Sequence, residues 1–297
     1  MRTGLVALRL SLRHGGDVAG VVVCDRDGRV TLLRSTQVLL AASPIETTRI
    51  LLETARVERV PLHDRVGQGL VDHLVVGRLV IAPRERRPGS DLPPALLIPR
   101  FVNARGRRSE YPGGFSVEIS RPASLDALPP ALRDALPPGC DGAGAIPLAV
   151  RTIHALGEMF PRPGRDVGLE PARLDALGRA VPRVRLLLHE HERRMLDDMD
   201  ETCDAVAAVL GGPDAVAIPT LAPRETFLLG HEAGTCAMGP GEGHPVDLGG
   251  RVRGLRGVRV VDGSLMPTAT DRHPTAALLA LTLAVTSSLL HDRRRTT

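Results

Sequence analysis

The sequence reads HEAGTCAMG at residues 231–239, VRVVDGSLMP at residues 258–267 and HPTAALLALTLAV at residues 273–285. The first stretch sets a histidine on a loop whose glycines allow close approach by a flat ligand. The second is an apolar strand ending in an acid and a glycine, and the third sets a histidine before a helix with proline in its first turn. Two imidazoles beside a helix N-terminus suit proton movement next to a bound anion or electron sink. These three segments therefore predict the position of the chemistry.

Length and composition describe a globular protein of one large domain or two medium ones. The chain has 297 residues, of which 43% are hydrophobic and 24% charged. Aromatic residues make up only 2%, so the core is predicted to be aliphatic. The net charge is +4, and the arginines are dispersed among acids. Since a nucleic-acid binder needs a basic stripe with stacking aromatics, nucleic acid is excluded as a partner.

The cysteines and the apolar segments bear on the compartment. The four cysteines are widely spaced and form no CxxC, which predicts reduced thiols in a cytoplasmic protein. Leu8, Leu10 and Leu12 alternate with polar residues, which indicates a strand and not a signal peptide. The most apolar segment, 275–290, is 290 − 275 + 1 = 16 residues long. That length falls short of the roughly 20 residues needed to span a bilayer, so we expect a soluble chain with no membrane partner.

The first part of the chain predicts a meander that leads into a β-α unit. Alternating apolar residues and turn signals predict strands over 5–12, 18–24 and 30–33. The apolar run 37–42 predicts a strand buried on both faces, and a helix is expected from residue 45. The carboxyl end of such a strand is the usual ligand position in open α/β sheets, which favours a nucleotide there.

The middle of the chain predicts further strands and one long helix. The expected strands are 75–81, 95–102, 114–119, 149–160, 166–169 and 183–189. A surface excursion containing a helix is expected over 120–144. Over 190–210, apolar residues recur at three- and four-residue spacing, which predicts an amphipathic helix.

Two polar motifs admit more than one interpretation. The run HEHE at 189–192 resembles metal ligands, but it lacks the HExxH spacing, and a solvated face is the favoured interpretation. The Asp72-His73 pair follows a glycine loop at 66–69. Taken alone, this pair favours a structural role over a catalytic one.

In the segments 231–239, 258–267 and 273–285 the chain resembles the C-terminal part of the glucose-methanol-choline (GMC) family of FAD-dependent oxidoreductases. The family pattern has a histidine, two residues and Gly-Thr-Cys-x-Met-Gly, matched by 231–239. A strand with Val-x-Asp-Gly-Ser-x-x-Pro, matched by 260–267, is followed by a histidine or asparagine before the last helix, matched by His273. Residues 38–52 and 66–73 resemble two upstream blocks of the family, so the resemblance runs from about residue 17 to about residue 290.

The resemblance implies oxidation of the CH–OH group of a small-molecule alcohol by an oxidase or dehydrogenase. His231 would take the hydroxyl proton while the hydride goes to flavin N5, and His273 would hydrogen-bond the same oxygen. A base must be neutral, and the unperturbed histidine pKa of about 6.5 makes that form available at neutral pH. Nothing in the sequence indicates which alcohol is used.

The resemblance also implies a set of contacts to FAD. Asp262 and Gly263 would contact its ribityl-pyrophosphate part, and the backbone of Pro274 and Thr275 would lie near the flavin ring. The residues expected near the adenosine are Ala42 and Ser43. Ser43 and its neighbouring proline stand where the family has a glycine-containing turn, which is a departure from its pattern.

The predicted fold class is α/β (α+β), with a partial Rossmann-like FAD-binding domain and a mostly antiparallel substrate domain backed by helices. We expect residues 1–73 to form the partial FAD-binding domain with its β-meander, and residues 74–230 to form the substrate domain. Residues 231–297 would carry the catalytic loop and return to the FAD-binding domain.

A glycine-rich GxGxxG loop after a first strand is absent from the sequence, although such a loop normally holds the FAD pyrophosphate. We therefore expect a truncated or split chain, with a separate chain supplying the N-terminal FAD-binding half at an open sheet edge. The alternative is a non-catalytic remnant or interaction subunit that does not bind FAD alone. Retention of both histidines, Asp262 and the glycine loop favours the enzyme.

Overall fold

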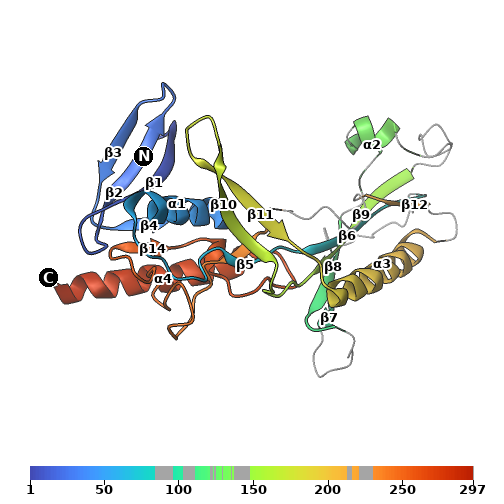
Figure 1. Cartoon of the computed structure of the whole chain (residues 1–297). Coiled ribbons are helices and arrows are strands. Elements are labelled where there is room, and N and C mark those ends of the chain that lie inside the picture. Colours follow the sequence, from blue (N-terminus) through green and yellow to red (C-terminus); the bar gives the residue numbers. More distant parts are fainter. Residues whose placement is uncertain are drawn as a thin grey trace.

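The computed structural model describes residues 1–83, 96–102, 111–120, 123, 125–128, 130–134, 136, 148–212, 216–220 and 230–296. The fold is mixed α/β, as predicted (Figure 1). Its strands are β1 (Leu5–Leu12), β2 (Val18–Asp25), β3 (Val30–Arg34), β4 (Val38–Leu40), β5 (Gln68–Val71), β6 (Leu74–Pro83), β7 (Leu96–Val102), β8 (Gly114–Ile119), β9 (Leu148–Gly157), β10 (Arg165–Leu174), β11 (Ala180–Leu186), β12 (Val216–Pro219), β13 (Ala233–Thr235) and β14 (Val258–Val260). Its helices are α1 (Ser43–Glu58), η1 (Leu125–Ala127), α2 (Pro130–Asp134), α3 (Glu190–Gly211), η2 (Gly263–Leu265) and α4 (Thr275–Thr296).

The predicted meander is present, and it adjoins a parallel strand pair. Strands β1, β2 and β3 form an antiparallel sheet, while β4 pairs with β14 in parallel, with Val38 opposite Val258. The prediction that residues 37–42 form a strand buried on both faces was wrong. The strand covers only Val38–Leu40, and the side chain of Leu39 is 46% exposed. The physical reason is that β14 is the only described strand paired with β4, and the described part of the chain leaves the side chain of Leu39 largely uncovered.

A five-stranded antiparallel sheet, in the order β12-β6-β9-β8-β7, forms the other end of the fold (Figure 1). Helix α3 was expected over 190–210 and is found over Glu190–Gly211, packed against this sheet. Its Met195 and Met199 are buried with Phe115 and Ile153 in one core. Glycine is required at position 157, because a Cβ there would lie 2.9 Å from the sulfur atoms of both methionines. The methionines of α3 therefore pack directly against the backbone of β9.

The start of α3 is only partly solvated: Glu190 is 68% exposed, but the interpretation of residues 189–192 as a solvated face was wrong for Glu192. Glu192 is 1% exposed, and its carboxylate lies 2.7 Å from a guanidinium nitrogen of the fully buried Arg165. The same guanidinium donates from Nε to the carbonyl of Leu187 at 2.8 Å. No group of three metal-ligating side chains exists in the described part of the chain. The acid is needed because a buried arginine requires a partner.

Helix α4 is longer than the apolar segment predicted. It covers 22 residues, and its window Thr275–Asp292 is long and apolar enough to cross a membrane by length and composition. Only 11% of that window is buried. Leu279, Leu283 and Leu290 are 51–67% exposed, whereas Val285 is fully buried against the turn at Gly250. One side of α4 therefore packs on the protein, and an apolar side faces outward.

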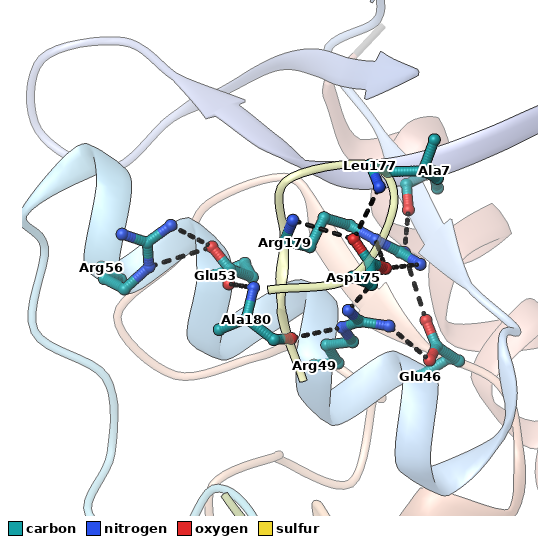
Figure 2. Close-up of polar contacts among 9 residues, drawn as sticks. All are labelled: Ala7, Glu46, Arg49, Glu53, Arg56, Asp175, Leu177, Arg179 and Ala180. Atoms are coloured by element: carbon teal, nitrogen blue, oxygen red, sulfur yellow. Dashed lines mark hydrogen bonds and ion pairs between the residues drawn. The ribbon is translucent and has the colours of Figure 1, made fainter. Parts of the chain in front are cut away.

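The β10–β11 hairpin is fastened to α1 by a polar network (Figure 2). Arg49, on α1, donates from Nε to the carbonyl of Ala180 at 3.0 Å and pairs with Asp175 at 2.8 Å. Arg179 pairs with the same Asp175 carboxylate at 2.9 Å and donates to the carbonyl of Ala7 on β1 at 3.2 Å. Glu53 accepts from the backbone N–H of Ala180 at 2.8 Å. The hairpin, α1 and β1 are thus held as one unit.

Replacing Asp175 by asparagine tests this network. Burial acts to raise the Asp175 pKa, but hydrogen bonds from Arg179, Leu177 and Arg49 lower it to about 2. A depressed carboxyl pKa stabilises the folded chain above the unfolded pKa of about 4, and the contribution is lost as the pH falls toward 2. We expect Asp175→Asn to lower the free energy of unfolding by about 1–2 kcal/mol at pH 7.

Urea unfolding of wild type and variant at several pH values measures this difference. The gap should narrow as the pH is lowered from 4 toward 2. The exposed Asp126→Asn serves as a matched control and should show no gap. An equal gap at pH 7 and at pH 3 would rule out the assigned role of the Asp175 charge.

Candidate active site

The structure brings the two predicted histidines together. The ring of His231 lies 4.9 Å from the ring of His273, centroid to centroid, with the planes at 84°. Nε2 of His231 faces Nδ1 of His273 at 3.4 Å. His231 lies on the loop that leads into β13, and His273 comes directly before α4. The two residues are 42 positions apart in the sequence. Two ring nitrogens facing one point are an arrangement for binding and deprotonating a hydroxyl.

A carboxylate that the sequence did not single out completes this pair. Glu118, on β8, accepts a hydrogen bond from Nε2 of His273 at 3.1 Å. Because Nε2 is thus engaged, the Nδ1 atom of His273 is the one that faces His231. A carboxylate on one ring nitrogen fixes the ring orientation and stabilises its protonated form. Sequence patterns missed Glu118 because it lies 155 residues from His273 and only the sheet register aligns it.

His73 is a third imidazole at the site. Its ring lies 5.1 Å from that of His231 at an interplanar angle of 83°, and it is only 2% exposed. The carbonyls of Thr270 and Arg272 face the ring, although no hydrogen bond of normal geometry reaches either ring nitrogen in the described structure. Burial first, and His231 second, lower the His73 pKa to about 4, although the carbonyls of Thr270 and Arg272 act to raise it. His73 therefore stays neutral at neutral pH.

The position of His73 follows from strand pairing. Strand β5 pairs with β13 in antiparallel register, with Val71 opposite Ala233. The residue two positions after Val71 thereby comes beside the residue two positions before Ala233. The sequence favoured a structural role for the Asp72-His73 pair, and only this register places the histidine against His231.

The five-stranded sheet presents a polar face to the segment before His273. On β8 and β9, Glu118 is opposite His154, and Ser116 donates to the carbonyl of Asp271 at 2.7 Å. Burial lowers the His154 pKa, Glu118 acts against that shift and His273 adds to it. Burial first, and the Asp271 carboxylate second, raise the Glu158 pKa to about 7. Glu118 and His154 therefore lie close to His273, on strands of the predicted substrate domain.

The residues expected near FAD form a connected group on the α1 side. The backbone N–H of Ala42 donates to the hydroxyl of Thr47 at 3.2 Å, and that hydroxyl donates to Asp262 at 2.5 Å. Asp262 also accepts the backbone N–H of Ser264 at 2.9 Å, which caps η2. Ser43 begins α1 with φ at +74°, a left-handed conformation that suits the glycine usual in the family at this turn. The turn therefore adopts the left-handed conformation typical of glycine, although serine occupies it.

Gly263, Pro274 and Thr275 lie where the loop and the last helix meet. A Cβ on Gly263 would clash with the carbonyl oxygen of Glu232, so a glycine is needed for packing at this point. Pro274 is buried, and Thr275 begins α4 and is exposed. The open first turn of α4 directs free N–H groups and the positive end of the helix dipole beside His273. Such donors fit a group that gains negative charge.

Two glycines of the 231–239 loop serve the fold and not a ligand, contrary to the expectation. A Cβ at Gly234 would overlap the carbonyl oxygen of Gly69, and one at Gly239 would overlap the ring of His244. Only Gly230 has open space on the side where a Cβ would lie. Neighbouring Thr235 has φ at +71° and is fully buried, so the loop is held in a strained path that presents His231.

Comparison with known proteins shows which family the chain resembles. The C-terminal family model described as GMC oxidoreductase matches residues 166–282. A 6'''-hydroxyparomomycin C oxidase of Streptomyces lividus is 28% identical in an alignment covering 99% of this chain and 53% of that protein. A GMC-type oxidoreductase of Rhodococcus erythropolis is 24% identical over 98% of this chain and 57% of that protein. Glucose oxidase 1 of Penicillium expansum is 41% identical over 63 residues, 21% of this chain and 10% of that protein.

Solved structures show the same fold. Pyridoxine 4-oxidase from Mesorbium loti has a TM-score of 0.61 at 19% identity, covering 97% of this chain and 57% of that one. Formate oxidase of Aspergillus oryzae RIB40 has a TM-score of 0.68 at 14% identity, covering 99% and 61%. The chain is thus similar to the GMC oxidoreductases over residues 166–282, and the relatives aligned with nearly all of it are named as an oxidase and a GMC-type oxidoreductase. The chain spans about half the length of the curated relatives that it matches from end to end.

The low pKa of His73 predicts a specific titration. Because the folded state favours the neutral ring, stability is fully present above the unfolded pKa of about 6.5 and is lost as the pH falls toward 4. We expect the His73 ring signals in NMR spectra to titrate near pH 4. His73→Leu should flatten the loss of stability between pH 6.5 and pH 4.

Assignment by variants gives the control for this titration. His14→Asn identifies the signals of an exposed histidine far from the site. A His73 ring that titrates near pH 6.5 would contradict the buried position described above.

Proposed function

We propose that this chain is the catalytic part of an FAD-dependent oxidoreductase that oxidises the CH–OH group of a small-molecule alcohol. The observation that carries the proposal is the pair of facing nitrogens, Nε2 of His231 and Nδ1 of His273, at 3.4 Å. A hydroxyl oxygen set in front of both nitrogens contacts both rings at once. Similarity to the GMC oxidoreductases over residues 166–282 supports the redox class, and the His231–His273 geometry supports alcohol as the reacting group.

The proton chemistry belongs to the chain's own residues. Neutral His231 takes the hydroxyl proton at Nε2, which makes the carbinol carbon a better hydride donor. His273 hydrogen-bonds the same oxygen through Nδ1, and Glu118 stabilises its protonated ring from Nε2 at 3.1 Å. His73 adds bulk and no charge behind His231, because its low pKa keeps it neutral. The developing alkoxide is thus met by the ring of His273, which is itself hydrogen-bonded to a carboxylate.

The residues present fit the flavin that the family uses. Pro274, Thr275 and the next backbone N–H groups of α4 would lie near the flavin ring, where the N–H groups would stabilise negative charge. Asp262 and Gly263 would lie along the ribityl chain, and Ala42 and Ser43 near the adenosine. A bound flavin supplies a two-electron acceptor for the hydride. The fit rests on the free first turn of α4 beside His273 and on the linked turn at Thr47 and Asp262.

We further propose that another polypeptide region, on this chain or on a separate one, supplies the glycine-rich loop for the pyrophosphate. Strands β4 and β14 pair only with each other among the described strands, and parallel sheets are normally covered on both faces. The exposed Leu39 and the outward face of α4 at Leu279 and Leu283 would receive added strands and helices. The proposal assigns this apolar surface to protein and not to lipid.

The thiols support a reducing compartment, and we propose the cytoplasm. The described cysteines, Cys24, Cys203 and Cys236, are free and buried. Burial raises the pKa of Cys203 to about 11 and that of Cys236 to about 12, so both thiols are unreactive.

Substitution of the histidines tests the proposed function. His231→Ala should lower kcat by about 10²- to 10⁴-fold, the usual worth of a general base, with a smaller change in KM. The assay uses the flavin-loaded protein and follows flavin reduction by stopped flow. Its alcohol panel takes the substrates in the names of relatives, namely glucose, pyridoxine and 6'''-hydroxyparomomycin C.

His14→Asn is the control variant and should leave the rate unchanged. Equal rates for wild type and His231→Ala would refute the assigned base. A purified protein that carries no flavin under any condition, including co-expression with a glycine-rich partner region, would favour the non-catalytic alternative.

Glu118 is predicted to be a positioning residue. Glu118→Gln keeps a hydrogen bond to His273 but removes the charge that favours its protonated ring. We expect kcat to fall by about tenfold and the pH–rate profile to move toward lower pH, since one pKa unit corresponds to about 1.4 kcal/mol. Glu118→Asp should restore part of the rate. A structural role alone would leave the pH profile in place.

A further inference from the structure

His231, the proposed base, has no described group that hydrogen-bonds its second ring nitrogen. Its Nε2 atom faces His273, whereas its Nδ1 atom is buried and has no hydrogen-bond partner among the described residues. His273 differs, because Glu118 accepts from its second ring nitrogen at 3.1 Å. A catalytic base is usually oriented by a third group that contacts it from behind. In the described part of the chain, packing must therefore orient the ring of His231.

The ring of His73 supplies that packing. It lies 5.1 Å from the His231 ring at an interplanar angle of 83°, and the His231 ring lies 4.9 Å from the His273 ring at 84°. The three imidazoles thus form a row in which each ring is nearly perpendicular to the next. Edge-to-face contact at such separations is a favoured geometry for flat rings. Because His231 is the middle ring, a rotation of its plane would break both contacts.

His73 is itself fixed by the fold. It lies between β5 and β6, is 2% exposed, and its backbone N–H donates to the carboxylate of Asp72 at 2.7 Å. Strand β5 pairs with β13 through Val71 and Ala233, so the junction that carries His73 is joined to the loop of His231. Burial lowers the pKa of His73 to about 4, so its ring is neutral and adds no charge beside the base.

His73 also contacts the segment that leads to the second catalytic histidine. The carbonyls of Thr270 and Arg272 face its ring. The carbonyl of Asp271, between them, accepts a hydrogen bond from the hydroxyl of Ser116 on β8 at 2.7 Å. The segment is therefore held by the His73 ring and by β8 together. Since the catalytic histidine is the next residue along the chain, its position depends on both contacts.

We infer that His73 is a positioning residue for the histidine pair. Its ring orients His231 by contact and holds the segment before His273, so that Nε2 of one ring and Nδ1 of the other converge on one oxygen. The inference rests on the proposed function for the reaction that this geometry serves. A displacement of about 1 Å in a reacting group can lower a rate by about 10²-fold. The role requires a flat ring at this position and no charge.

Variants at position 73 test the role by rate. His73→Ala removes the ring and is expected to lower kcat by about 10- to 100-fold with little change in KM, because the alcohol still binds but the two nitrogens no longer converge. His73→Phe restores a flat uncharged ring and should recover most of kcat. His73→Leu, which fills the volume without a flat ring, replaces the alanine variant if that one does not fold, with the same expected loss.

Ile81→Ala is the matched control for lost stability. Ile81 is 2% exposed and packs in a separate core with Leu79 and Val150. Its truncation should lower the free energy of unfolding and leave kcat unchanged. An equal fall of kcat in Ile81→Ala and His73→Ala would assign the effect to stability and overturn the inference. A phenylalanine variant as slow as the alanine variant would also overturn it.

NMR spectra test the same role without the reaction. Nuclear Overhauser effects between the ring protons of His231 and His273 are expected in the wild type and in His73→Phe, and should be lost in His73→Ala. Their absence from the wild type, or their persistence in His73→Ala, would overturn the inference. Wild-type kcat in His73→Ala would overturn it and leave the proposed function in place. Loss of the ring contacts in His73→Ala, with no alcohol oxidised by the wild type, would support the positioning and refute the proposed function.

Discussion

The contact between Nδ1 of His273 and Nε2 of His231, at 3.4 Å, is the interaction on which the rest of this structure depends. One ring comes from a strained loop and the other from the residue before the proline of the last helix. Glu118, from a third element, fixes the second ring at 3.1 Å. A one-residue slip in β8 would turn that carboxylate to the opposite face of the sheet. The five-stranded sheet is therefore required for the chemistry as well as for the core.

The two ends of the molecule are joined by charged contacts and by backbone crossings. Arg49 fastens the β10–β11 hairpin to α1, and β5 runs between β10 and β13 in one sheet. The buried pair of Arg165 and Glu192 fixes the start of α3. Such pairs add little net free energy, but breaking one leaves a buried charge without a partner. They specify how the elements meet, and so they specify where the histidines meet.

The exposed apolar surface and the polar site at the histidine pair favour different kinds of partner. Apolar side chains such as Leu39, Leu279 and Leu283 remain exposed where a parallel strand pair and a long helix lack cover. The chain matches whole family members over about half their length, which agrees with a surface that other protein covers. At the site, by contrast, the unpartnered groups are polar. An apolar surface favours contact with more polypeptide, whereas facing imidazoles favour a polar small molecule.

The sequence by itself determined most strands, the helices α3 and α4, and the two histidines, because these depend on short-range periodicity and on a spaced motif. It predicted β1 at its observed bounds, Leu5–Leu12. It failed where the answer depended on pairing between distant segments: the exposure of Leu39, the burial of Glu192, and the approach of Glu118 and His73 to the histidine pair. Those outcomes depend on the register between paired strands and on which elements cover each face of a sheet or helix. Neither can be predicted from the local sequence. Tertiary structure alone decided which further polar residues, Glu118 and His73, join the two histidines at the site.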